Sequence, residues 1–407
     1  MLPIVEIPPV VRTNMTHFDE IFSKPQRDNF SRYVTGLIIS GKPSIKAINS
    51  MFLEKKNQSS MNRFLTESDW DEEEMNNKRI EMLQKNPDTR WNSSGVVSID
   101  DTIEHKTGKK IEGADYVFDH CENKSVLGFD IVTSQYVDQN KHYPISLRPY
   151  FREKTLEEDK EISNKFQFKS RIILACELVG DAERRGVPVR IYVFDSWYFV
   201  DELTDKVESY EKFWVTRMKS NRLVMYKGKA MQIAEFAKQL PDKVFRKIKI
   251  GHTEYYTFTK SMKLANNKKK ARIVISHKEK DRSDDPYLII TNNLMWESKK
   301  IVETYSLRNP IEPFYRDVKQ NLGFEGSQLR DIEGRIKHWH MVFVAYSLLK
   351  LEICCSRLSR CLNAKLTIGK RCFNTALDVL QSLITLAYKM FSEKKPLNQI
   401  LEVLVKR

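Results

Sequence analysis

The stretch Tyr305-Ser-Leu-Arg308-Asn-Pro-Ile-Glu312-Pro-Phe-Tyr-Arg-Asp-Val-Lys319 is the segment from which the rest of the chain is best interpreted. It predicts the start of a helix, because Asn309 can cap, Pro310 suits the first helical position and Glu312 falls at the third. Glu312 is one acid among several cations. A glutamate in a capping box stabilises a helix end by about 1 kcal/mol and needs no other role. The remaining sequence decides whether Glu312 also has a chemical role.

The positive charge of the chain is concentrated in one segment. The net charge is +14 over 407 residues, and residues 217–282 hold 19 Lys and Arg against 5 Asp and Glu, an excess of 14. The other 341 residues are therefore close to neutral. A concentrated basic block predicts a nucleic-acid-binding surface, because phosphate backbones attract clustered lysine and arginine.

Composition argues against several other classes of protein. Hydrophobic residues make up 41% of the chain, enough for the cores of two or three domains. No run of about 18 apolar residues occurs, so we expect no membrane span, and the first residues lack the pattern of a signal peptide. The six cysteines show neither metal-binding nor disulfide spacing, which favours a reducing intracellular setting.

The first 92 residues are expected to form a helical region that binds DNA. After an extended arm at residues 1–16, helical patterns occur at 18–22, 30–39, 43–52, 59–65 and 72–85. The pair at 43–52 and 59–65, joined by a tight polar link, resembles a helix-turn-helix with Arg63 near the start of the second helix. An ordinary helical bundle is the alternative.

Strand patterns then alternate with helices. Strands are predicted at 96–99, 125–137, 142–151, 189–194 and 213–218, with helices near 168–186 and 200–207. This order predicts an α/β fold with a mixed sheet. Asp101 and Asp195 each follow a strand closely, and functional groups gather at strand ends in open α/β sheets. Packing alone explains neither aspartate well.

The basic segment is predicted to be a β-rich insertion. Residues 244–250, 253–264 and 272–277 alternate apolar and polar positions, and residues 266–270 are typical of a hairpin turn. A strand at 287–291 and a helix at 297–307 lead back to the opening stretch. Beyond it we expect a long apolar helix at 332–355 and amphipathic helices over 373–407.

Three carboxylates from distant segments, Asp101, Asp195 and Glu312, could share one chemical task. Mg²⁺ prefers oxygen ligands and is typically held by a few carboxylates together with substrate phosphates. Two such ions about 3.5–4 Å apart can activate a nucleophile and stabilise the leaving oxygen in phosphoryl transfer. A chain with 54 acids offers many such triples, so the interpretation depends on the placement of the two aspartates at strand ends.

Three motifs resemble the signatures of insertion-sequence transposases with a DDE site. The spacing Tyr305-x2-Arg308-x3-Glu312-x6-Lys319 matches the Tyr-Arg-Glu-Lys signature of that family. Ile99-Asp100-Asp101-Thr102, followed by Lys106-Thr-Gly-Lys109, resembles its first-aspartate motif. Val193-Phe-Asp195-Ser-Trp-Tyr198 resembles the second, with Lys219-Ser-Asn-Arg222 after the next strand. The resemblance covers about residues 20–350.

The resemblance implies an α/β protein with an RNase H-like mixed-sheet core, interrupted by a β-rich insertion and flanked by N- and C-terminal helical regions. The expected parts are 1–92 (helical, DNA-binding), 93–220 (first part of the core), 221–283 (basic insertion), 284–355 (second part of the core, with Glu312) and 356–407 (helical). The family pattern favours Asp101 over Asp100 as the first ligand. Asp101, Asp195 and Glu312 would hold two Mg²⁺ ions, for which Mn²⁺ would substitute.

The resemblance also implies roles in DNA binding. Tyr305 and Arg308 would contact the terminal phosphate region, and Lys319 the adjacent backbone. Further candidates for DNA contacts are Lys219, Arg222 and Arg63. Tyr287 and Trp296 are candidates for stacking on a flipped base, because an extruded base needs an aromatic partner; a place in the core is the alternative for both.

The implied function is that of a cut-and-paste DNA transposase. Such enzymes cleave inverted-repeat ends, join each end as a hairpin, reopen it and transfer the freed 3′-OH to target DNA. The expected partners are double-stranded DNA and a second copy in a homodimer, in the cytoplasm and associated with the nucleoid when DNA is bound. A catalytically silent, transposase-derived DNA-binding protein is the alternative from another class, and a general nuclease with the same core is a third.

Overall fold

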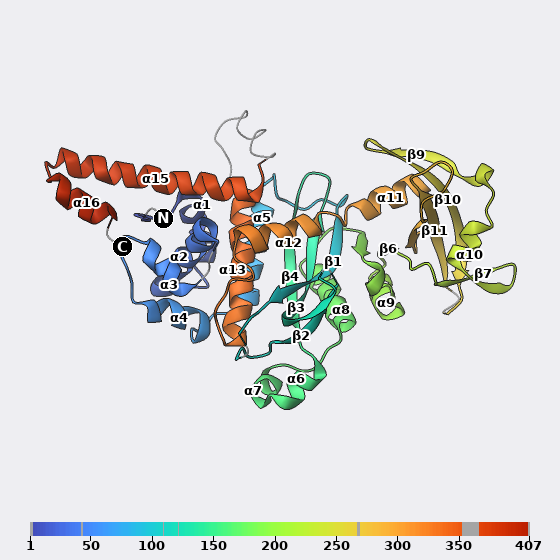
Figure 1. Ribbon diagram of the computed structural model, residues 1–407, viewed down its shortest axis with the longest axis horizontal. Helices are drawn as coiled ribbons and strands as arrows, with labels where there is room; N and C mark the ends of the chain where they lie inside the picture. Colours follow the sequence, from blue (N-terminus) through green and yellow to red (C-terminus); the bar gives the residue numbers. More distant parts are fainter. Residues whose placement is uncertain are drawn as a thin grey trace.

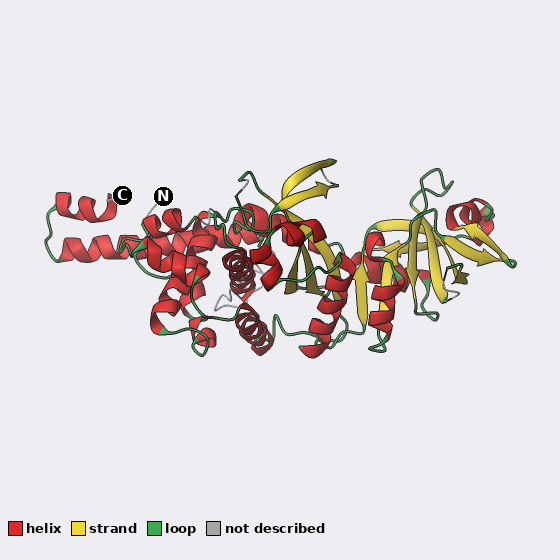
Figure 2. Ribbon diagram, turned by 90° about the horizontal axis from the view of Figure 1, so that it is seen from below, coloured by secondary structure: helices red, strands yellow, loops and turns green. Residues whose placement is uncertain are grey.

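The computed structural model describes residues 3–41, 44–108, 110–120, 122–266, 269–351 and 366–405. The molecule is elongated, with helices at one end, a mixed sheet through the middle and a β-rich segment at the other end (Figure 1). The view from below shows the same arrangement, with successive strands lying one after another from the middle of the molecule to the β-rich end (Figure 2).

The N-terminal helices form a bundle against the long helix α13 (Ile332–Leu351). They are α1 (Pro9–Arg12), η1 (Met15–Phe18), α2 (Lys24–Ser40), α3 (Ile45–Met51), α4 (Gln58–Thr66) and α5 (Glu72–Lys85). The expected helix at 18–22 is wrong, because a 3₁₀ turn ends there instead. Arg63 was expected near the start of its helix but lies in the second half of α4, where its side chain is exposed.

Among the described residues, one twelve-stranded mixed sheet organises the rest of the molecule. Its central strands follow the spatial order β4 (His142–Tyr150), β3 (Lys124–Val137), β1 (Val96–His105), β5 (Ile191–Phe194) and β6 (Phe213–Arg217). β3 runs antiparallel to β1 and to β4, whereas β1, β5 and β6 are parallel. The predicted α/β class with a mixed sheet is confirmed.

Two strand predictions need correction. β1 was expected to stop at Ile99, but it continues to His105, because residues 100–105 keep pairing with β3. Asp100 and Asp101 therefore lie inside the strand and not after it. The edge strand β2 (Asp115–Asp119) was missed, since its five residues carry a charge at each end and give little alternation.

Helices cover both faces of the central sheet. α8 (Arg171–Arg184) packs on β3 and β4, and α9 (Asp201–Glu208) packs on α8 and β6. The short helices α6 (Glu153–Glu158), α7 (Lys160–Lys165) and η2 (Ser196–Tyr198) complete the connections on either side of α8. α11 (Ser298–Ser306) contacts β6 and the later strand β12 (Tyr287–Thr291), and α12 (Ile311–Asn321) contacts β1.

The basic segment extends the same sheet. Its elements are β7 (Leu223–Tyr226), β8 (Lys229–Gln232), α10 (Ile233–Lys238), η3 (Asp242–Val244), β9 (Arg246–Ile250), β10 (Thr253–Leu264) and β11 (Lys270–His277). β11 pairs with β12 (Tyr287–Thr291), and β12 pairs with β6. An unbroken ladder of hydrogen bonds therefore joins the β-rich segment to the core. The bounds of β10 and β12 are those predicted.

The predicted capping box at Glu312 is wrong. α12 begins at Ile311 with Pro310 in the N-cap position and no side-chain cap, and the Glu312 backbone N–H donates to the Asn309 carbonyl oxygen at 3.3 Å. Asn309 therefore contributes backbone where a capping side chain was expected. The Glu312 carboxylate makes no capping bond among the described residues.

The C-terminal region is helical, as predicted, with α15 (Ile368–Ser392) and α16 (Leu397–Val405) packed against each other. Residues 352–355 of the predicted long helix lie outside the described residues. None of the helices in the described ranges combines the length and apolar character that a membrane span requires.

Candidate active site

Asp100 and Asp101 point to opposite faces of β1. Successive side chains alternate along a strand, so Asp101 shares a face with Val97 and Ile99, and Asp100 shares the other with Val96. The face of Asp100 is covered by α11 and α12, since Tyr305 of α11 belongs to the same apolar cluster as Val96. The face of Asp101 is covered by α8. The strand thus presents one carboxylate to each side of the sheet.

Asp100 lies next to Arg308, just before the start of α12. Its carboxylate forms an ion pair with the Arg308 guanidinium, and its strand partner Thr133 shares a hydrogen bond with the Tyr315 hydroxyl at 2.7 Å. Burial raises the pKa of Asp100 to about 7, with Arg308 opposing and Asp101 and Asp195 adding to the rise. Three carboxylates therefore feel one another's charge here.

Asp101 belongs to a second cluster on the α8 side. Its Oδ1 atom accepts a hydrogen bond from the Tyr198 hydroxyl at 2.8 Å. Asp130 of β3 is 1% exposed and pairs with Arg171, the first residue of α8. Burial, reinforced by the charge of Asp101, raises the pKa of Asp130 to about 7. This second acid cluster was not predicted from the sequence, because Asp130 falls in the middle of an apolar strand.

Asp195 directly follows β5, as predicted. The parallel register pairs Ile99 with Phe194, so the next residues of both strands, Asp100 and Asp195, reach the same sheet edge. The charge of Asp195 acts on the pKa values of Tyr287 and Tyr305, which places it on the side of α11. Among the described residues its carboxylate has no hydrogen-bond or ion-pair partner, so its oxygens are available to a ligand.

Glu312 reaches this cluster through Arg308. Arg308 lies one helical turn before Glu312, and its Nη1 atom is 3.4 Å from Glu312 Oε1. Burial lowers the pKa of the Arg308 guanidinium. The nearby groups Asp100, Tyr305, Asp195 and Glu312 raise that pKa by more than burial lowers it, so the net shift is upward. The Glu312 side chain is 71% exposed. One guanidinium thus bridges a strand carboxylate and a helix carboxylate that are 212 residues apart in sequence.

The donor set fits a hard divalent cation. Carboxylate oxygens are the ligands that Mg²⁺ and Mn²⁺ prefer, and Asp195 and Glu312 both present oxygens to solvent. Within the described ranges, the carboxylate oxygens of the three predicted ligands do not come within 4.8 Å of one another. The group whose ligand atoms do is His105, Asp119 and Glu122. The predicted carboxylates share a region of the molecule, and Asp101 faces away from the other two.

The predicted phosphate-binding residues are largely occupied by protein contacts. Tyr305 is buried, and its pKa is raised by burial and the neighbouring Tyr287. Lys319 donates to the Ile103 carbonyl oxygen at 2.7 Å and pairs with Glu325 at 2.8 Å. Both residues therefore hold α11 and α12 against the core in this structure.

The remaining predicted DNA contacts differ in how available they are. Lys219 is exposed in the turn after β6. Arg222 donates to the Phe199 carbonyl oxygen at 2.6 Å and lies over the Phe199 ring. Arg63, on the bundle at the far end of the molecule, is exposed.

Tyr287 and Trp296 have different surroundings. Tyr287 is 39% exposed, and its ring centroid lies 6.1 Å from that of Tyr305. The Arg217 guanidinium lies over the Tyr287 ring, 4.4 Å from its centroid. Trp296 is half-buried and packs on Phe213 at 5.6 Å. The core interpretation suits Trp296, whereas Tyr287 has an accessible ring beside the carboxylates.

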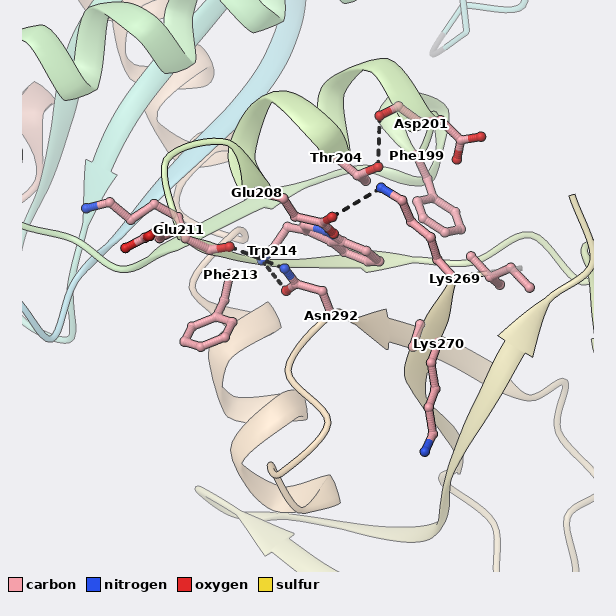
Figure 3. A pocket seen from close by; sticks show the side chains of 13 residues that line it. Phe199, Asp201, Thr204, Glu208, Glu211, Phe213, Trp214, Lys269, Lys270 and Asn292 are labelled. Carbon is pink, nitrogen blue, oxygen red and sulfur yellow. Dashed lines mark hydrogen bonds and ion pairs between the residues drawn. The ribbon is translucent and has the colours of Figure 1, made fainter. Parts of the chain in front are cut away.

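The basic segment meets the core at a cavity of about 490 Å³ between α9, β6 and the start of β11. Figure 3 shows the side chains around it, with Lys269 reaching from the basic segment to α9. Lys269 pairs with Asp205 and, at 3.1 Å, with Glu208, whose carboxylate also accepts the Trp214 indole N–H at 2.8 Å. Lys269 thus ties the two parts together, while Asn267 and Lys268 of the predicted hairpin turn lie outside the described residues.

An aspartate within β1, another directly after the parallel strand β5, a later helix with a solvent-facing glutamate, and a basic β-rich segment together fit a nuclease-type enzyme. The comparison with known families agrees. The family described as DDE superfamily endonuclease matches residues 17–239, and the family described as Transposase DDE domain matches residues 173–348. The chain therefore belongs to the DDE superfamily of endonucleases, to which DDE transposases are related. No curated protein matches the chain.

Proposed function

We propose that the protein is a DNA transposase that cleaves the inverted-repeat ends of an insertion sequence and transfers them to target DNA. The observation that supports it best is the Arg308 bridge, which joins Glu312 at the start of α12 to Asp100 within β1, while the charge of Asp195 after β5 also acts on Arg308. The central strand order β4-β3-β1-β5-β6, with antiparallel pairs followed by parallel pairs, supports an RNase H-like core. For the whole chain we propose the five parts 1–92, 93–220, 221–283, 284–355 and 356–407.

The residues that would hold the metal are Asp195, Glu312 and one aspartate of β1. The resemblance assigns Asp101, whereas the contacts favour Asp100, because Asp100 shares its side of the sheet with Asp195 and Arg308. Bound Mg²⁺ or Mn²⁺ would supply charge stabilisation at the reacting phosphate and a more acidic bound water. Arg308 would orient the phosphate through its planar donor groups, and the exposed Tyr287 ring would stack on a displaced base.

The nucleophile would be water in the first cleavage and a DNA 3′-OH in the later steps, with a hairpin intermediate on the transposon end. Cleavage of an end duplex in Mg²⁺ or Mn²⁺ tests the proposal, using DNA that flanks the coding region. We expect Asp195→Asn to abolish cleavage. Glu303→Gln, which changes a half-exposed acid on α11, should leave cleavage intact. Equal cleavage by Asp195→Asn and the parent would refute the site.

The two aspartates of β1 are distinguished by paired variants. We expect the variant of the true ligand to lose cleavage by at least about 100-fold, because a lost ligand removes several kcal/mol of charge stabilisation. If Asp100→Asn loses cleavage and Asp101→Asn retains it, the ligand is Asp100; the reverse result assigns Asp101. If both variants cleave normally, neither aspartate binds metal.

The other two classes give different outcomes in the same assay. A silent DNA-binding protein binds the end duplex with or without metal and never cleaves it. A general nuclease cleaves but leaves no joined product with target DNA. Formation of a joined product therefore supports a transposase. We propose that this protein acts in the cytoplasm and is associated with the nucleoid when it is bound to DNA.

We also propose that the protein acts as a homodimer joined through α15 and α16. An apolar stripe runs along the outer face of α15 at helical spacing, comprising Phe373, Leu377, Ile384, Tyr388 and Phe391, all about half-exposed or more. Contiguous exposed apolar surface commonly marks an interaction site. Sedimentation analysis of the double variant Ile384→Glu, Tyr388→Glu tests this, and a parent protein that is monomeric with and without DNA would refute it.

A further inference from the structure

A histidine and two carboxylates meet at the far end of β1, away from the candidate active site. His105 is the last residue of β1, Asp119 is the last residue of β2, and Glu122 lies in the turn between β2 and β3. One ligand atom from each of the three lies within 4.8 Å of the other two. His105 is four residues beyond Asp101, so the cluster is about 13 Å further along the strand.

The two carboxylates contact different nitrogens of the His105 ring. His105 Nε2 is 2.7 Å from Asp119 Oδ2, and His105 Nδ1 is 3.8 Å from Glu122 Oε1. The Glu122 backbone N–H donates to Asp119 Oδ1 at 3.3 Å, which fixes the turn, and Lys124 pairs with the other oxygen of Glu122 at 2.7 Å. Each carboxylate therefore keeps one oxygen directed to His105 while its second oxygen is held elsewhere.

The donor types suit a small transition-metal cation, which would bind the imidazole through one of its two nitrogens. Ligands about 2.1 Å from Zn²⁺ at tetrahedral angles lie about 3.4 Å apart. One ligand atom of each residue already lies within 4.8 Å of the other two, so small side-chain rotations would bring the three to that separation. Imidazole nitrogen with carboxylate oxygen is a donor set for Zn²⁺ and similar ions rather than for Mg²⁺, which prefers oxygen alone. Three protein ligands would leave a position for water. The cluster is partly exposed, so an ion can enter from solvent.

The neighbouring histidine provides a contrast within the same turn. His120 is exposed, and its ring packs edge-on against the Phe118 ring at 5.0 Å. It takes no part in the group of three ligands. A merely histidine-rich turn would bind metal through either histidine, whereas this geometry selects His105.

We propose that His105, Asp119 and Glu122 form a second metal site that binds Zn²⁺ or a similar transition-metal ion and fastens the β2–β3 hairpin to the end of β1. The site is independent of the proposed transposase activity. It requires neither Asp195 nor Glu312, and its ligand types select a different ion.

Zn²⁺ titration of the full-length Asp195→Asn protein tests the proposal, because that background removes a ligand of the proposed Mg²⁺ site. We expect binding of one equivalent of Zn²⁺. His105→Gln keeps a donor for Asp119 but loses the imidazole ligand, so binding should weaken by at least about 100-fold, beyond the 10–100-fold effect of losing an outer partner. His120→Ala should bind like the Asp195→Asn parent.

Two results would overturn the proposal: unchanged Zn²⁺ affinity in the His105→Gln variant, or an equal loss in the His120→Ala variant. Circular dichroism of each variant shows whether the fold is kept, and Asp119→Asn gives a second ligand test if His105→Gln is unfolded. Cleavage of end DNA in Mg²⁺ by His105→Gln should match that of the otherwise unaltered protein. The outcome for the zinc site is thus separable from that for the active site.

Discussion

Replacing Glu312 by glutamine separates a structural from a chemical role for this residue. The side chain is 71% exposed and makes no capping bond, and its ion-pair partner among the residues that the structure describes is Arg308, at 3.4 Å. An exposed ion pair of this kind contributes about 0–1 kcal/mol, so the free energy of unfolding should change by less than about 1 kcal/mol. Glu312→Ala should be tolerated almost as well, because no helix cap is lost.

The effect on chemistry should be much larger. Loss of a metal ligand removes several kcal/mol of transition-state stabilisation, and each 1.36 kcal/mol is a factor of ten in rate. We therefore expect cleavage of end DNA by Glu312→Gln to fall by at least about 100-fold. Denaturant unfolding and single-turnover cleavage on the same preparations measure both quantities.

The matched control is Glu303→Gln, which removes a half-exposed acid of α11 whose carboxylate lies 3.9 Å from Lys299. Its cleavage rate should stay within about twofold of the parent rate, and its free energy of unfolding within about 1 kcal/mol of the parent value. The reasoning is refuted if Glu312→Gln cleaves at a rate within threefold of the parent. A large loss of stability in that variant would instead restore a structural role for the glutamate.

Three further predictions concern DNA binding and stability. Lys249→Glu, at an exposed lysine, should reduce the slope of log K for DNA binding against log salt concentration by about one unit. Lys269→Glu should change this slope less, because Lys269 is already paired within the protein. An unchanged slope for Lys249→Glu in fluorescence anisotropy would count against this surface. Arg335→Met should destabilise the fold by about 3–5 kcal/mol in urea unfolding, because it removes a partner of the fully buried Glu104, and the double variant with Glu104→Met should recover part of that loss. Burial lowers the pKa of His340 to about 4, so the stability it contributes is present above pH 6.5 and is lost as the pH falls toward 4; a flat profile of unfolding free energy between pH 7 and 4 would contradict this.

The elements that sequence predicted best are those with strong local patterns. β10 and β12 alternate or run apolar between clear turn residues, and α5 begins at a capping Asp71 and ends at Asn86. The continuation of β1 through Asp100 and Asp101 was missed, because aspartates disfavour strands and only the pairing with β3 holds them there.

The candidate site was predictable in its residue types but not in its contacts. The four-residue spacing between Arg308 and Glu312 follows from the sequence, whereas the ion pair of Arg308 with Asp100 joins residues 208 positions apart. Which aspartate faces α12 depends on the register of β1 against its neighbours, and a shift of one residue reverses it. Local sequence cannot specify that register.

The unbroken ladder from β5 to β10 has a consequence for how the protein would measure DNA. Because β5, β6, β12, β11 and β10 are successive neighbours in one sheet, no hinge separates the basic strands from the aspartate after β5. Four steps of about 4.8 Å give about 19 Å, close to the length of six base pairs at about 3.4 Å each. If DNA lies across these strands, the sheet acts as a ruler that sets the position of the cut at a constant number of base pairs from the gripped segment.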